Sequence, residues 1–219
     1  ELGTSDESSG LLVLPEDAPI GMDVREYLSL DDTLFTIKLT PNRADCLSLL
    51  GIAREVGAIT GATTNLPVVP EVPASIADQR NIMLDAPEAC PLYCGRVIKG
   101  VDAKAPTPEW MKVRLERSGI RAISALVDVT NYVMLELGQP LHAFDNTRLE
   151  GAVHARLAKP EEKLLLLNEQ TIAVDPDVLM IADDAKPLAM AGIMGGEESG
   201  ITLDTSELFL ESAFFAPKA

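Results

Sequence analysis

The sequence predicts an α+β protein in which a small helical module precedes a larger, β-rich domain. An amphipathic pattern near residue 50 is typical of a helix, and a proline-rich stretch separates it from the longer second part of the chain. Beyond residue 138, short strand-like runs alternate with Asn, Asp, Gly and Pro. Because 47% of the 219 residues are hydrophobic, the chain has enough apolar sequence for a sizeable core.

The first expected regular element is a strand over residues 33–40. Within it, Phe35, Ile37 and Leu39 alternate with more polar residues, which is the period-2 pattern of a half-buried strand. The break at Pro41 ends this strand.

A helix is expected next. Asp45 is its candidate N-cap and Gly61 its C-terminal stop, and apolar residues recur between them at spacings of three and four, namely Leu49, Ile52, Val56 and Ile59. Residues 66–73 contain three prolines and are expected to form an irregular linker.

The second half begins with an expected strand over residues 93–99. Thr107, Pro108 and Glu109 have the order of a helix start, with a capping side chain, a proline and an acidic residue, and Gly119 ends that helix. Five further strands are expected at residues 152–157, 163–167, 171–174, 178–182 and 207–210.

Composition limits the class of function. The chain has 18 Lys and Arg against 34 Asp and Glu, a net charge of −16, so any contact with nucleic acid must be local. Three cysteines favour a reducing, cytoplasmic location over a disulfide framework. No run approaches the roughly 20 apolar residues of a membrane span, and no signal peptide is recognised. The first residue is Glu1, and we expect a section of a longer polypeptide.

Only two histidines are available for acid–base chemistry. His154 lies in a predicted strand, where a solvated side chain is the expected role. His142 lies in a segment bounded by Gly138 and Pro140, and this predicted loop can aim its imidazole into a cleft. The segment alone leaves a structural and a functional histidine equally open.

Other chemistries are poorly supported. Cys90 and Cys94 with two distant histidines do not have the paired spacing of zinc ligands, so no metal site is predicted. Cys46 is expected to be a buried, inert thiol. Residues 192–196 lack a phosphate-loop pattern, and their glycines favour a close backbone approach to a ligand or another strand.

Several segments, in the same order, resemble the bacterial phenylalanyl-tRNA synthetase beta subunit. The resemblance rests on Thr40-Pro41-Asn42-Arg43-Ala44-Asp45, Val127-Asp128-Val129-Thr130-Asn131, Gly138-Gln139-Pro140-Leu141-His142 and Gly192-Ile193-Met194-Gly195-Gly196. It implies that residues 1–32 are the C-terminal remnant of an OB-fold tRNA-binding insertion. Residues 33–71 would be the second half of a split helical module. Residues 72–219 would be an editing domain, truncated at its C-terminus, with a layered β-sandwich-like core and flanking helices.

The resemblance also implies an activity. The parent enzyme attaches phenylalanine to its tRNA with ATP and Mg²⁺, whereas the editing domain hydrolyses mischarged tyrosyl-tRNA and needs no cofactor of its own. The implied partners are the alpha subunit, in an assembly of two alpha and two beta subunits, and the acylated 3′ end of the tRNA. No membrane partner is expected.

The resemblance further assigns roles to residues. Glu211 is the expected acceptor for the tyrosine phenol, and His142 lies near the scissile ester; both are classed as catalytic. Arg121, Thr130, Asn131 and Gly195 would bind substrate, although Thr130 and Asn131 also suit an ordinary turn. Two alternatives stay open, a non-catalytic structural or RNA-binding scaffold and a zinc hydrolase.

Overall fold

A computed structural model describes residues 13–219, which fall into two units. The first unit ends at Lys38 and contains one helical turn, α1 (Val24–Tyr27), whose N-cap Asp23 accepts a hydrogen bond from the Arg25 backbone N–H. The second unit spans Leu39–Ala219 and holds all the described strands. Residues 1–12 of the predicted OB-fold remnant lie outside the described residues, and the three predicted domain boundaries stay predictions.

The strand predicted over residues 33–40 is wrong. These residues have no regular secondary structure, and the Phe35 side chain is 82% exposed. An alternating pattern becomes a strand only when a neighbouring strand takes up its backbone hydrogen bonds, and the described part of the chain offers none here.

The predicted amphipathic helix is confirmed as α2 (Leu49–Thr60). It begins later than expected because the chain first forms the 3₁₀ turn η1 (Ala44–Cys46), so that the N-cap is Ser48 and not Asp45. The Ser48 hydroxyl accepts from the Gly51 N–H at 3.0 Å, and Gly61 ends the helix with φ of 74°. The linker is confirmed, since residues 61–74 contain no helix or strand.

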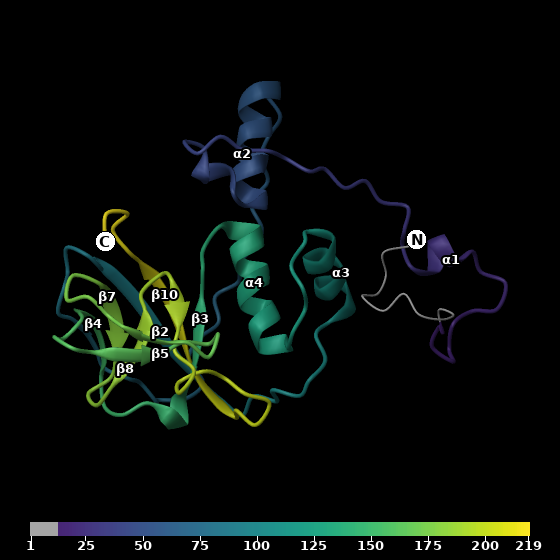
Figure 1. Cartoon of the computed structure of the whole chain (residues 1–219). Coiled ribbons are helices and arrows are strands. Elements are labelled where there is room, and N and C mark those ends of the chain that lie inside the picture. The colour runs from purple at the N-terminus through teal and green to yellow at the C-terminus, as the bar shows by residue number, and fades with distance from the viewer. Residues whose placement is uncertain (1–12) are drawn as a thin grey trace. The chain divides into compact units, whose positions relative to one another are not determined.

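The β-rich part consists of two main sheets and a hairpin, as Figure 1 shows. The larger sheet has the order β1 (Ile82–Leu84), β4 (Val153–Leu157), β7 (Leu179–Ala182), β8 (Pro187–Met190) and β9 (Met194–Gly195). The smaller sheet has the order β2 (Leu92–Lys99), β10 (Glu207–Phe214) and β3 (His142–Asp145), and β5 (Lys163–Leu165) pairs with β6 (Thr171–Ala173). Six of the seven strands predicted from the sequence are confirmed, the exception being residues 33–40. Of these six, β10 is longer than expected, whereas β1, β3, β8 and β9 are additional strands that were not predicted.

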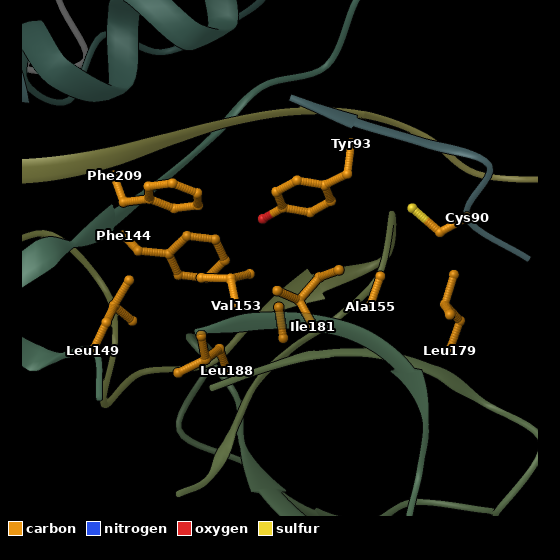
Figure 2. Packing of buried hydrophobic residues seen from close by; sticks show 11 residues of the cluster. Cys90, Tyr93, Phe144, Leu149, Val153, Ala155, Leu179, Ile181, Leu188 and Phe209 are labelled. Atoms are coloured by element: carbon orange, nitrogen blue, oxygen red, sulfur yellow. The ribbon is translucent and has the colours of Figure 1, made fainter. Parts of the chain in front are cut away.

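The main core lies between the two sheets, which confirms the sandwich-like architecture. Figure 2 shows Tyr93, Phe144 and Phe209 from the three-stranded sheet facing Val153, Ile181 and Leu188 from the five-stranded sheet. Burial of these side chains supplies the main stabilising free energy of the domain. The two sheets therefore pack face to face around one shared hydrophobic core.

Two helices flank this sandwich. The predicted helix start near Thr107 is confirmed as α3 (Glu109–Arg117), but Pro108 is the N-cap, and the Thr107 hydroxyl instead hydrogen-bonds the Asp128 carboxylate. Gly119 follows the helix with φ of 80°, as expected. No helix in residues 13–219 is long and apolar enough to cross a bilayer.

The second flanking helix, α4 (Ala125–Leu137), was not predicted. Its valines lower helix propensity and resemble strand sequence, so the periodic signal is weak. Asp128 in its first turn is fully buried and accepts from the Ile123 backbone N–H at 2.9 Å. A buried carboxylate with two donors therefore fixes the N-terminal end of α4.

Packing of β2 against the central strand β10 predicts that Gly95→Ala destabilises the domain. A Cβ at Gly95 would lie 2.2 Å from Cζ of Phe209, a fully buried ring that has little room to move. We expect a loss of about 1–3 kcal/mol in the free energy of unfolding, measured by chemical denaturation. Cys94→Ala, at the exposed neighbouring position, is the matched control, and equal denaturation midpoints for the two variants would contradict the packing argument.

Candidate functional site

Cross-strand pairing in the three-stranded sheet brings a carboxylate and an imidazole together. In the antiparallel register, Glu211 of β10 lies opposite Gly95 of β2 on one side and opposite His142 of β3 on the other. Directly opposite residues share a face of a sheet, with Cβ atoms about 4.5–5.5 Å apart. Side chains alternate between faces, so Glu211 shares the core-facing side with Phe209.

Glu211 and His142 line a cavity of about 730 Å³. Its walls come from the segment before β3, from β7, from β8 through β9, and from the end of β10 with the residues after it. Two further hollows, of about 490 and 500 Å³, lie beside residues 72–81 and contain neither histidine. The 730 Å³ cavity is therefore the candidate site.

Glu211 is a buried carboxylate with one strong donor. Its residue is 7% exposed, and the Tyr93 hydroxyl donates a hydrogen bond to Oε2 at 2.6 Å. Burial raises the pKa of the Glu211 carboxyl to about 7, against the opposing effect of the Tyr93 hydrogen bond. Burial and the neighbouring Glu211 in turn raise the pKa of Tyr93, so its phenol stays a donor.

His142 carries an unsatisfied nitrogen. Its Nε2 is buried and has no hydrogen-bond partner among residues 13–219, while the ring packs edge-on against Phe144 at 4.4 Å between centroids. Burial lowers the pKa of the imidazole below its usual value, so the ring is neutral at pH 7. An unpaired buried polar atom costs about 1–3 kcal/mol, which a ligand or water can relieve.

Gly195 of β9 allows the backbone to approach this imidazole. A Cβ at Gly195 would lie 2.7 Å from Cε1 and 3.0 Å from Nε2 of His142. A Cβ at Gly196 would lie 2.5 Å from the Leu188 backbone oxygen of β8. The close approach predicted for residues 192–196 is confirmed, because these glycines let β9 pack against both a strand and the His142 ring.

The structure brings three of the six sequence-predicted site residues together in the cavity: His142, Gly195 and Glu211. His142 does not lie in a loop, as predicted, but begins β3, because β10 supplies the backbone partners for that segment. Glu211 lies within β10 and not after a strand ending at residue 210, because β2 pairs with the whole of β10.

The other three predicted residues lie outside the cavity walls. Thr130 and Asn131 are in the middle of α4, where the Thr130 hydroxyl donates to the Val127 backbone oxygen at 2.7 Å, so the turn alternative is wrong. Arg121 is exposed between α3 and α4. Their roles in substrate binding stay predictions. Tyr93 was missed, because an aromatic residue in a strand is typical of a core position and only the register shows what its hydroxyl contacts.

The remaining candidate ligands are separate from this cavity. His154 lies between two carboxylates, with Nδ1 2.7 Å from Asp85 and Nε2 2.8 Å from Asp184, and these contacts raise its pKa. It is thus an ion-paired side chain more than a freely solvated one. Cys46 is buried, as predicted. Within residues 13–219, His, Cys, Asp and Glu form no group of three that could hold a metal ion.

The chain is similar to known proteins. Residues 89–219 match the profile of the B3/4 domain family. Over its full length, the chain is 87% identical to the phenylalanine–tRNA ligase beta subunit of Dechloromonas aromatica and 67% identical to that of Aromatoleum aromaticum. It spans 28% of the length of each of these relatives.

A solved N-terminal fragment of the phenylalanyl-tRNA synthetase beta subunit from Pyrococcus horikoshii also aligns. The alignment covers 81% of this chain and 54% of that one, with 16% identity and a TM-score of 0.48.

The environments of the two histidines predict opposite titrations. The His142 pKa should lie below 6.5 because of burial, and the His154 pKa above 6.5 because of its two carboxylates. Neutral His142 is favoured in the fold, so its contribution to stability is lost as pH falls below 6.5. Protonated His154 contributes at pH values below 6.5, and that stability is lost as pH rises through its raised pKa.

NMR titration of the ring resonances measures both values, because the chain has only two histidines. His154→Gln assigns the signals by removing one of them. Two titrations with the same midpoint would contradict the environments described for the two rings.

Proposed function

This chain belongs to the B3/4 domain family and matches phenylalanine–tRNA ligase beta subunits along its whole length, and we propose that its cavity hydrolyses tyrosyl-tRNA specific for phenylalanine. The observation that supports this proposal is the juxtaposition of a buried carboxylate, Glu211, and an unpartnered imidazole nitrogen of His142 in one cavity. One group selects the tyrosine side chain, and the other acts at the ester.

Glu211 can supply the selectivity that an aminoacylation site for phenylalanine lacks. A pocket for phenylalanine rejects tyrosine weakly, because the two differ only by one hydroxyl. A second site that offers a buried acceptor reverses the preference. A phenol pairs with the Glu211 carboxylate, whereas phenylalanine leaves that buried acceptor unpaired, at a cost of about 1–3 kcal/mol.

His142 can act on the hydrolytic water. Its neutral Nε2 accepts a proton while the water oxygen bonds to the ester carbonyl carbon. The bond from that carbon to the ribose oxygen then breaks, and the proton passes to the ribose oxygen. The products are free tyrosine and uncharged tRNA. Gly195 keeps the space beside Nε2 free of a side chain.

The activity of the whole synthetase is proposed in the same way. We place this chain in a cytoplasmic enzyme that charges phenylalanine, with an alpha subunit as partner in an assembly of two alpha and two beta subunits. ATP and Mg²⁺ would serve aminoacylation in the parent enzyme and take no part in the hydrolysis described above. The second candidate function is a non-catalytic scaffold. A scaffold would not require the buried polar pair of Glu211 and His142.

Deacylation of tyrosyl-tRNA by the intact two-subunit enzyme tests the proposal. His142→Ala should lower the rate about 10²- to 10⁴-fold, the usual contribution of general acid–base catalysis. Glu211→Ala should reduce the preference for tyrosyl- over phenylalanyl-tRNA about 10- to 150-fold, the worth of a hydrogen bond to a charged group.

His154→Ala is the matched histidine control, because His154 lies outside the cavity. Aminoacylation by every variant reports whether the enzyme is intact. Wild-type deacylation rates in both site variants would refute the assignment, and an inactive wild-type enzyme would favour the scaffold.

Charge predicts that the isolated chain binds tRNA weakly. With a net charge of −16, it has few cations to release counterions from the phosphates. We expect a dissociation constant on the order of 10⁻⁴ M or weaker at physiological salt, the weak end of non-specific binding. Filter binding over a range of salt concentrations measures it, and nanomolar, salt-resistant binding would contradict a contact limited to the acylated end.

A further inference from the structure

We propose that Tyr93 is a positioning residue for selectivity: its hydroxyl holds Oε2 of Glu211, so that Oε1 is the oxygen that accepts the phenol of the substrate. This inference rests on the proposed function and extends it to a residue outside the cavity walls. Its basis is a contact between two strands, β2 and β10, that the fold holds in a fixed register.

Tyr93 is fixed in place by the core. It lies two residues from Gly95, the cross-strand partner of Glu211, so the two side chains are diagonal neighbours on one face. Its ring is 8% exposed and stacks on Phe209 at 6.4 Å between centroids, with 13° between the ring planes. Figure 2 shows the Tyr93 hydroxyl pointing between the two sheets. The donor therefore cannot move away without opening the core.

The bond uses only one of the two carboxylate oxygens. Oε2 accepts from Tyr93 at 2.6 Å, while Oε1 has no hydrogen bond among residues 13–219, and the residue itself lines the cavity. A carboxylate with one oxygen held is limited to one orientation. Its second oxygen is then a preorganised acceptor, which a substrate phenol can meet without first ordering the side chain.

The Tyr93 hydroxyl is important for the ionisation of Glu211, because few other polar groups of residues 13–219 surround this carboxyl. The titratable groups that face it are Tyr93 from β2, His142 from β3 and Cys90 from the segment before β2. No Lys or Arg is among the residues that line the cavity. Burial favours the protonated carboxyl, and the Tyr93 hydroxyl is the contact that favours the ionised form.

Loss of the Tyr93 hydroxyl should therefore weaken selectivity in two ways. The Glu211 carboxyl becomes free to rotate, and its pKa rises further because no other group within residues 13–219 stabilises the charge. An ionised acceptor forms a stronger hydrogen bond with a phenol than a protonated carboxyl does. The preference for tyrosyl-tRNA should fall at neutral pH and recover in part at higher pH.

The test measures kcat/KM for deacylation of tyrosyl- and phenylalanyl-tRNA between pH 6 and 9 with the intact two-subunit enzyme. For Tyr93→Phe, we expect the ratio of the two constants to fall about 10-fold at pH 7, the effect of one hydrogen bond to a charged group. The midpoint of its pH dependence should move to a higher pH. Tyr132→Phe is the matched control, since that tyrosine is equally buried in a separate cluster with α3.

A second variant covers the case in which Tyr93→Phe does not fold. Glu211→Gln still accepts from Tyr93 but cannot ionise, so the pH dependence of the ratio should disappear.

An unchanged ratio and midpoint in Tyr93→Phe would overturn the positioning role while the proposed function stands, provided that Glu211→Ala still loses the preference. A pH dependence in Glu211→Gln equal to that of the wild type would also overturn it. Failure of the wild-type enzyme to deacylate tyrosyl-tRNA would overturn the proposed function and this inference with it.

Discussion

The pairing of β10 between β2 and β3 is the constraint on which the rest of the domain depends. This one strand contributes Phe209 to the core and Glu211 to the cavity, two residues apart on the same face. Its register fixes what each side chain meets on both neighbouring strands. A shift by one residue would turn both side chains to the opposite face, so the stability of the core and the geometry of the cavity are set by the same hydrogen bonds.

The buried polar groups of the domain are not equally satisfied. Asp128 accepts from the Ile123 backbone and from Thr107, and Asp145 accepts from Thr147 and Thr205, so both carboxylates are fully occupied in holding the fold. His142 differs, because its Nε2 has no partner within residues 13–219. Buried polar atoms are normally paired, and an exception in a cavity wall marks a group available for a ligand.

The acidity of the chain and its proposed contact with tRNA are compatible. A charge of −16 disfavours wrapping a polyanion, but a deacylation site needs only the last acylated nucleotide. The described residues that line the cavity include no Lys or Arg, so no cation among them attracts phosphate into the pocket. In the proposed reaction, local geometry, more than net charge, selects the part of the RNA that is bound.

Elements whose signals are local could be predicted from the sequence. Spacing and caps located α2, turn residues separated most strands, and the glycines at 192–196 indicated a close backbone approach. The resemblance to a known family predicted His142, Gly195 and Glu211 as site residues, and the three line one cavity. The prediction of a strand over residues 33–40 was wrong, because a local pattern cannot supply the partner strand that a sheet needs.

Contacts between distant segments could not be predicted in this way, because they depend on how the chain folds. The helix α4 forms despite its valines because buried Asp128 and packing against α3 hold it. The Tyr93–Glu211 hydrogen bond joins residues 118 positions apart, and no local pattern encodes such a pair. Burial, which changes the pKa of Glu211 and of His142 in opposite directions, is likewise a property of the assembled sandwich. The sequence contains the chemical groups of the site, and the fold determines their protonation and the distances between them.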